Sequence, residues 1–180
     1  MMKAVFFDRD GVVNEDFGYV YEPKEFVFTD GIFDLLKFCK EKDFLLLLIT
    51  NQSGIGRGYY TLDEFKELTR YMQDELKKRL GFGFDSIYFC PHNPKKDCLC
   101  RKPKPGMIEK AKKDYDLCPS ECFIIGDKIT DMQAGEAGGI KNKILLTKGN
   151  QKPFEEQGIH IVYSLKQALE VINDLLEGKK

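Results

Sequence analysis

Two aspartates lie two residues apart near the start of the chain, in the stretch DRDG from Asp8 to Gly11. Side chains at positions i and i+2 of an extended chain point to the same side, so Asp8 and Asp10 can enter one site while Arg9 points away. Two carboxylates this close repel each other, and Mg²⁺ relieves the repulsion because it binds oxygen ligands and shares substrate phosphate oxygens. Asp and Gly are also common turn residues, so the spacing indicates phosphate chemistry only together with other clusters.

The two carboxylates could take different parts in a phosphate transfer. An aspartate at a strand end can be a nucleophile, because an acyl phosphate on its carboxylate divides one difficult transfer into two easier ones. We predict this role for Asp8. Asp10, held beside that negative charge, would be biased toward the protonated form and could protonate the leaving alkoxide. Gly11 would let the backbone turn so that N–H groups face the phosphoryl oxygens.

Three further polar clusters could serve the same reaction. They are TNQSG, RKPKPG and GDKITD, which begin at positions 50, 101 and 126. Thr50 and Asn51 can donate hydrogen bonds to a transferring phosphoryl group, and Lys102 can balance the charge that spreads over its oxygens. The candidate phosphate- and substrate-binding residues are Thr50, Asn51, Ser53, Arg57, Arg101, Lys102 and Lys128.

A magnesium site needs a carboxylate from outside the DRDG stretch, and Asp127 ends another predicted strand. The candidate Mg²⁺ ligands are therefore Asp8, Asp10 and Asp127.

A second metal site is indicated by Cys90, His92, Cys98 and Cys100, which form the pattern C-x-H-x5-C-x-C. Four soft ligands can close a tetrahedral Zn²⁺ site with no open position for water, as in structural zinc sites. The segment between the ligand pairs is rich in Pro and Lys and has nothing apolar to pack. We therefore predict a zinc-binding loop over residues 90–102. The metal would stiffen this loop, which brings Arg101 and Lys102 to the phosphate-binding edge of the sheet.

Strands and helices alternate along the chain. The predicted strands are Lys3–Asp8, Phe44–Thr50, Ser86–Cys90, Cys122–Asp127, Lys143–Thr147 and Ile161–Tyr163. The predicted helices are Gly31–Lys42, Leu62–Leu80, Pro105–Tyr115, Ile129–Ala137 and Leu165–Leu176, with capping boxes at Thr61/Glu64 and Ser164/Gln167. This alternation predicts an α/β fold with a three-layer, Rossmann-like open parallel sheet. Ligands bind at the carboxyl ends of such strands, where each polar cluster is expected to lie.

Together the clusters resemble the haloacid dehalogenase (HAD) superfamily of phosphohydrolases over nearly the whole chain. The stretches FFDRDGVVN, TNQSGIGRG, CPH with CLCRKPKPGM, and GDKITDMQAG are similar to the D-glycero-D-manno-heptose 1,7-bisphosphate 7-phosphatase family. That resemblance implies a Mg²⁺-dependent phosphatase that uses an aspartyl phosphate and serves nucleotide-activated heptose and lipopolysaccharide core biosynthesis.

The same resemblance implies the site roles. Asp8 is the nucleophile and Asp10 the acid/base, while Thr50 and Lys102 bind phosphate. Mg²⁺ is held by Asp8, Asp127 and the carbonyl of Asp10, and Asp131 supports these ligands without binding the metal.

The distances between motifs leave no room for an inserted cap domain. About twenty residues separate Gly11 from the first predicted helix, which is enough for a loop or hairpin but not for a folded lid. We therefore expect a single HAD-like domain over residues 1–180 with an open site. Arg57 and Arg101 are candidates for holding a second anionic group of a sugar bisphosphate.

Two alternatives stay open. The first is that the protein is a histidinol-phosphate phosphatase, because the spacing of five residues between His92 and Cys98 is short, as in that related family. The other alternative is a signalling domain that holds phosphate on Asp8 without turnover. Asp10 argues against it, because a storage domain needs no group to protonate a leaving alkoxide.

Composition excludes some partner classes. The formal net charge is −1, which does not favour nucleic acid as a partner. The N-terminus is neither a signal peptide nor a membrane span, so we expect a cytoplasmic protein, with reduced thiols available for zinc. The expected partner is a small phosphorylated sugar, and the expected state is a monomer.

Overall fold

The computed structural model describes residues 1–149 and 158–178, which form a six-stranded parallel sheet with the strand order β3-β2-β1-β4-β5-β6. The strands are β1 (Ala4–Phe7), β2 (Leu45–Asn51), β3 (Ser86–Cys90), β4 (Phe123–Gly126), β5 (Asn142–Leu146) and β6 (Ile159–Val162). The predicted open parallel sheet is confirmed. All six strands lie within two residues of their predicted positions, because buried apolar runs mark central parallel strands clearly.

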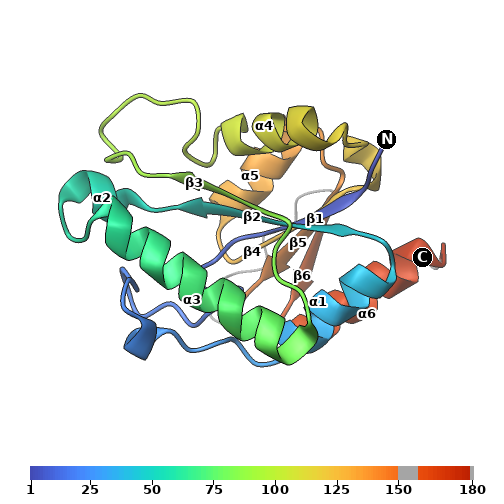
Figure 1. The fold of residues 1–180 in the computed structure, drawn as a ribbon. Coiled ribbons are helices and arrows are strands. Elements are labelled where there is room, and N and C mark those ends of the chain that lie inside the picture. The colour runs from blue at the N-terminus through green and yellow to red at the C-terminus, as the bar shows by residue number, and fades with distance from the viewer. Residues whose placement is uncertain (150–157, 179–180) are drawn as a thin grey trace.

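Helices cover both faces of the sheet, which gives the three expected layers (Figure 1). The longer helices are α1 (Ile32–Glu41), α3 (Leu62–Leu80), α4 (Gly106–Tyr115), α5 (Ile129–Ala137) and α6 (Leu165–Leu176). On one face α1, α3 and α6 pack against side chains such as Phe7 and Leu48. On the other face α4 and α5 pack against their neighbours Phe6 and Leu47, because alternate residues of a strand point to opposite faces.

Three short helices of the described residues were not predicted: 3₁₀ turns η1 (Pro23–Glu25) and η2 (Pro119–Glu121), and α2 (Ser53–Arg57), which begins inside the TNQSG stretch. The capping box of Thr61 and Glu64 is confirmed, with Glu64 N–H donating to Thr61 Oγ1 at 3.2 Å. At α6, Ser164 accepts from Gln167 N–H as expected. However, the Gln167 side chain accepts from Tyr163 N–H at 2.7 Å, one residue before the expected partner.

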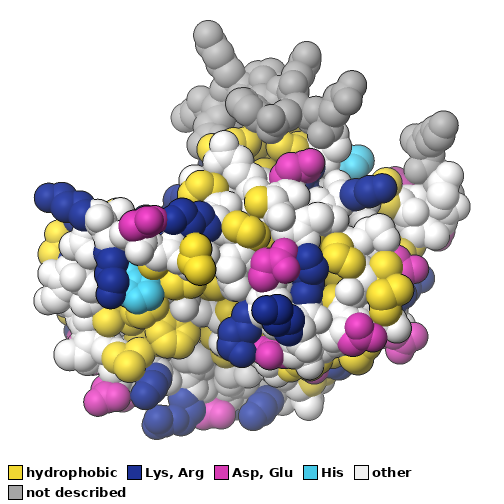
Figure 2. Space-filling view, turned by 90° about the horizontal axis from the view of Figure 1, so that it is seen from above, with side chains coloured by type: hydrophobic (Ala, Val, Ile, Leu, Met, Phe, Trp, Pro, Cys, Tyr) yellow, Lys and Arg dark blue, Asp and Glu magenta, His cyan; other side chains and the backbone are white. Residues whose placement is uncertain are grey.

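The loops that follow the strands gather at one edge of the sheet. In Figure 1, α2 and the loop between β3 and α4 lie at the same end of the molecule, away from the N-terminus. Within residues 1–149 and 158–178, no inserted cap domain separates these loops. Along this part of the chain, no helix has the length and apolar character needed to cross a bilayer. The face shown in Figure 2 carries basic, acidic and hydrophobic side chains interspersed, as the near-zero net charge suggests.

Candidate active site

Asp8 lies just beyond the end of β1, where its backbone N–H still donates to Ile125 O of the neighbouring β4 at 3.0 Å. Its carboxylate oxygen Oδ1 accepts from the backbone N–H of Arg9 at 2.8 Å and pairs with Lys102 Nζ at 2.9 Å. Both contacts fall on Oδ1, so Oδ2 is the oxygen that remains for chemistry.

Lys102 is 4% exposed and reaches under the site from the loop before α4. Its ammonium also contacts Asp131 Oδ1 at 2.6 Å and donates to Ile49 O at 2.9 Å. Burial would lower the pKa of Lys102, but the carboxylates of Asp8 and Asp131 outweigh it and raise that pKa above its ordinary value. Lys102 therefore stays charged beside Asp8.

The side chains of Asp8, Asp127 and Asp131 converge so that one carboxylate oxygen of each lies within 4.8 Å of the others. Burial raises the pKa of Asp8 to about 7, against the opposing effect of Lys102, and raises the pKa of Asp127 to about 6. Asp127 Oδ1 is buried and has no hydrogen-bond partner among the described residues. An unpaired carboxylate oxygen in a cluster of acids fits a hard divalent cation such as Mg²⁺.

Asp127 comes this close to the DRDG loop because of Gly11. The φ angle of Gly11 is +91°, in the left-handed region, and a Cβ at this position would lie 2.3 Å from Asp127 Oδ2. Any larger residue would push the two strand ends apart.

Asp10 accepts hydrogen bonds from three side chains. Arg9 Nη2 donates to Oδ1 at 2.9 Å, Asn14 Nδ2 to Oδ1 at 3.1 Å and Gln52 Nε2 to Oδ2 at 3.0 Å. The expectation that Arg9 points away is wrong, because its guanidinium folds back onto the neighbouring carboxylate. The buried Arg9 also donates to Val20 O at 2.6 Å. The charged group in direct contact with Asp10 is therefore the Arg9 guanidinium and not the Asp8 carboxylate.

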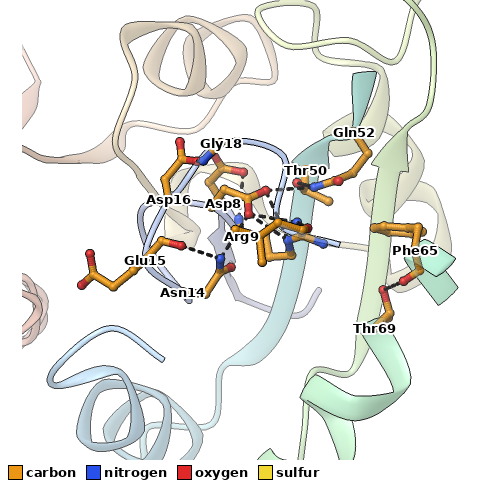
Figure 3. Close-up of polar contacts among 12 residues, drawn as sticks. Asp8, Arg9, Asn14, Glu15, Asp16, Gly18, Thr50, Gln52, Phe65 and Thr69 are labelled. Atoms are coloured by element: carbon orange, nitrogen blue, oxygen red, sulfur yellow. Dashed lines mark hydrogen bonds and ion pairs between the residues drawn. The ribbon is translucent and has the colours of Figure 1, made fainter. Parts of the chain in front are cut away.

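Gln52 is a site residue that sequence reasoning missed. Its amide Nε2 donates to Thr50 Oγ1 at 2.8 Å as well as to Asp10, and its Oε1 accepts from the Tyr60 hydroxyl at 2.5 Å. In Figure 3, Thr50 and Gln52 lie next to each other beside the loop that carries Asp8 and Arg9. Gln52 lies inside the TNQSG motif, but only the fold shows which member of that motif contacts Asp10.

A cavity of about 460 Å³ opens over these groups. It is lined by Asp8, Asp10, Asp16, Gly18, Tyr19, Asn51, Gln52, Ser53, Tyr60, Arg101, Lys102, Lys128, Thr130 and Asp131. Of the predicted residues, Thr50 and Asp127 are not part of this lining, and Thr50 is 1% exposed. Arg57 is exposed and lies outside the lining, on the last turn of α2.

Asn51 lines the cavity as expected for a substrate-binding residue and also contacts the backbone of Lys102. Its Oδ1 accepts from Lys102 N–H at 3.0 Å and its Nδ2 donates to Lys102 O at 3.1 Å. This pair of bonds ties the backbone of the β3–α4 loop to the end of β2 and holds Lys102 in place.

The side chains of Cys90, His92, Cys98 and Cys100 form one cluster, as their spacing predicts. The Sγ atom of Cys98 lies 3.6 Å from that of Cys90 and 3.8 Å from that of Cys100. His92 Nδ1 lies 3.5 Å from Cys90 Sγ and 3.2 Å from Cys100 Sγ. Zinc–sulfur bonds of about 2.3 Å at tetrahedral angles place two sulfurs roughly 3.8 Å apart, so the cluster could bind Zn²⁺.

Comparison with known proteins places these features in a family. Residues 99–177 match the HAD-hydrolase-like family model. A D-glycero-beta-D-manno-heptose-1,7-bisphosphate 7-phosphatase of Helicobacter pylori strain J99 is 53% identical over 150 residues, which cover 83% of this chain and 86% of that protein. The Pasteurella multocida protein of the same name is 42% identical over 186 residues and is matched over the whole length of both chains.

The chain belongs to this family of HAD-like phosphatases. It is a phosphoric monoester hydrolase. A solved structure of the family, the D,D-heptose 1,7-bisphosphate phosphatase from B. bronchiseptica complexed with magnesium and phosphate, superimposes with a TM-score of 0.85. The two proteins share 29% identity, and the match covers 99% of each chain. The predicted HAD-like fold is therefore confirmed.

Proposed function

We propose that this protein is a Mg²⁺-dependent phosphatase that removes the 7-phosphate of D-glycero-D-manno-heptose 1,7-bisphosphate, in the synthesis of nucleotide-activated heptose for lipopolysaccharide core. The observation that carries the chemistry is the buried contact of Lys102 with Asp8 beside two further carboxylates. Relatives up to 53% identical that carry this activity in their names support the substrate.

In the first step, Asp8 Oδ2 attacks the phosphorus of the 7-phosphate. The bond from phosphorus to the sugar oxygen breaks, its electron pair stays on that oxygen, and Asp10 supplies the proton. The sugar leaves as an alcohol, and Asp8 carries the phosphoryl group.

In the second step, a water molecule attacks the phosphorus of the aspartyl phosphate. Asp10 takes the proton from this water, the bond between phosphorus and the Asp8 oxygen breaks, and phosphate leaves. Both steps need donors to the phosphoryl oxygens. We assign this part to the ammonium of Lys102, on the β3–α4 loop, and to the hydroxyl of Thr50, near the end of β2.

The magnesium ligands would be Asp8, Asp127 and the backbone carbonyl of Asp10. When bound, the ion neutralises charge on the phosphoryl oxygens and on the clustered carboxylates. Asp131 has two other partners, since it contacts Lys102 and accepts from Lys128 N–H at 3.0 Å. It therefore supports the site from the start of α5.

The second phosphate of the substrate needs a cation at the rim, and Arg101 is the better candidate of the two arginines. It lines the cavity next to Lys102, and its buried Nη1 has no hydrogen-bond partner among the described residues. Arg57 lies outside the lining, so it would contact only a substrate that extends beyond the cavity.

The test is initial rates of phosphate release in Mg²⁺, with heptose 1,7-bisphosphate compared with histidinol phosphate. We expect a strong preference for the bisphosphate, because only that substrate offers Arg101 a second anionic group. Histidinol phosphate is the comparison substrate, because the short spacing from His92 to Cys98 is similar to that of histidinol-phosphate phosphatases.

An Asp8→Asn variant provides the mechanistic control, because asparagine keeps the shape but is not a nucleophile. It should lose turnover while keeping its circular dichroism spectrum. A preference for histidinol phosphate would overturn the substrate assignment. Phosphate release by the Asp8→Asn variant would reject the aspartyl phosphate.

A further inference from the structure

A largely buried chain of polar contacts runs along the cavity lining from Tyr60 to the reacting groups. Tyr60 is 5% exposed and Gln52 is 2% exposed. The Tyr60 hydroxyl contacts Gln52 Oε1 at 2.5 Å, and the amide then reaches both Asp10 and Thr50. Neither Tyr60 nor Gln52 has a part in the steps described above.

The Tyr60 hydroxyl determines which way the Gln52 amide faces. Burial raises the pKa of Tyr60 to about 12, so the phenol keeps its proton and donates it to Oε1. With Oε1 held there, both N–H groups of Nε2 face the site, one on Asp10 Oδ2 and the other on Thr50 Oγ1. Without that donor the amide could turn over and set its oxygen against the Asp10 carboxylate.

Thr50 gains a defined orientation from the same amide. Because Thr50 Oγ1 accepts from Gln52, its own proton is left for another acceptor, and a phosphoryl oxygen above it is the acceptor that the reaction supplies. In Figure 3 the side chains of Thr50 and Gln52 lie in contact beside the Asp8 loop. The Gln52 amide therefore orients both Thr50, which donates to the phosphoryl group, and Asp10, which transfers the proton.

Packing holds the Tyr60 ring in the position that this contact requires. The ring stacks on Tyr21 with centroids 5.2 Å apart and planes at 9°. On another side, a Cβ at Gly54 would lie 2.1 Å from Tyr60 Cε1, so the backbone of α2 presses directly against the ring.

We propose that Tyr60 is a positioning residue for the phosphatase reaction and acts through Gln52 on Asp10 and Thr50. This inference rests on the proposed function, because it assigns Asp10 and Thr50 their parts in phosphate transfer. It assigns a part to a residue that the two reaction steps above do not use.

The first test is a Tyr60→Phe variant, which removes one hydroxyl and keeps the stacked ring. A lost hydrogen bond of this kind predicts a kcat about five- to tenfold lower, with KM for heptose 1,7-bisphosphate within about twofold of its original value. Tyr21→Phe is the matched control, because it removes a hydroxyl from the ring that stacks on Tyr60 and leaves the stacked rings in place. It should leave kcat unchanged.

The second test shows whether Tyr60 acts through Gln52. Gln52→Met keeps the volume but removes the amide, and it should lower kcat more than Tyr60→Phe does. Adding Tyr60→Phe to Gln52→Met should then change nothing further, because the hydroxyl has lost the group it orients. Equal fractional losses from Tyr60→Phe in both backgrounds would overturn the proposal.

A binding measurement separates this inference from the proposed function. Orthovanadate mimics the transferring phosphoryl group, so in Mg²⁺ its affinity should fall severalfold in Tyr60→Phe and stay unchanged in Tyr21→Phe. If the unaltered protein fails to hydrolyse heptose 1,7-bisphosphate, the proposed function fails, whereas the vanadate comparison still tests Tyr60. Equal vanadate affinities for Tyr60→Phe and the unaltered protein would reject the positioning role.

Discussion

At the scale of single residues, the active site holds charged groups where their charge is costly. Asp127 is mostly buried, and its Oδ1 has no partner among the described residues. Burial raises the pKa of Asp127 to about 6, despite the opposing charge of Lys128. The carboxylate therefore destabilises the metal-free fold at neutral pH, and a bound cation would remove that cost.

This cost predicts a pH-dependent gain in stability for an Asp127→Asn variant in magnesium-free buffer. In the unfolded chain the carboxylate ionises near pH 3.8, but in the folded protein it ionises near pH 6. Between these values the folded state binds more protons, so its free energy of unfolding falls as pH rises. Asparagine does not titrate. The variant should therefore gain up to about 3 kcal/mol over the unaltered protein at pH 8, and nothing from this source at pH 3.

Urea unfolding at several pH values measures this difference. Asp174→Asn, which changes an exposed carboxylate on α6, is the control and should show no such trend. Added Mg²⁺ should stabilise the unaltered protein more than the Asp127→Asn variant. A stability difference that does not change with pH would contradict the assignment of the cost to Asp127.

At the scale of elements, the β3–α4 loop carries Arg101 and Lys102 but has little apolar surface to hold it. Leu99 is its large hydrophobic residue and is 79% exposed. The loop is instead tied by the Cys/His cluster, by Asn51 and by close packing on α2. A Cβ at Gly56 would lie 2.4 Å from the backbone nitrogen of Asn93. Zinc would therefore stabilise this loop, which has little apolar packing of its own.

We predict that Cys98→Ser loses the zinc and lowers activity, while the sheet stays folded. Serine is a poor zinc ligand, and without the metal the loop keeps only its contacts with Asn51 and α2, so Arg101 and Lys102 are held less firmly at the cavity. The expected result is about one zinc per unaltered chain, less in the variant, and at least a tenfold loss of kcat/KM as an order of magnitude.

Elemental analysis and phosphate release measure the two effects on the same preparations. Cys118→Ser is the control, because Cys118 lies outside the cluster and should leave zinc and activity unchanged. Carefully purified protein without zinc would refute the structural site.

At the scale of the whole molecule, both hydrophobic clusters share the same sheet. One includes Val5 and Phe7 of β1, and the other includes Ala4 and Phe6 of the same strand. Neither side can lose its packing without exposing the central strands. The groups of the active site come from the ends of β1, β2 and β4 and from the β3–α4 loop, so they meet only when the sheet is complete.

This shared sheet predicts one cooperative unfolding transition. Urea curves followed by far-ultraviolet circular dichroism, which reports secondary structure, and by tyrosine fluorescence, which reports packing, should coincide. Mg²⁺ should move both curves together. Two separated transitions would contradict the expectation of a single domain.

The sequence by itself determined the sheet and the residues of the Cys/His cluster, and it predicted the end of the sheet to which we assign the chemistry. Strands such as β2 are apolar runs that end at polar residues, and Cys90 to Cys100 lie close together at the end of β3 and in the loop after it, so local spacing carries this information. The capping box at Thr61 was predicted for the same reason, since both partners lie within one turn.

Tertiary structure decided the contacts between residues that no local pattern links. Gln52 meets Asp10 across 42 positions, and Lys102 meets Asn51 across 51, because parallel strands bring distant segments to one edge. Arg9 folds back onto Asp10 because the chain leaves the extended conformation after β1, where the alternation of side chains no longer holds. The proposed chemistry could therefore be inferred from residue types and spacing, whereas the side chains that orient the reacting groups depended on how the strands pack.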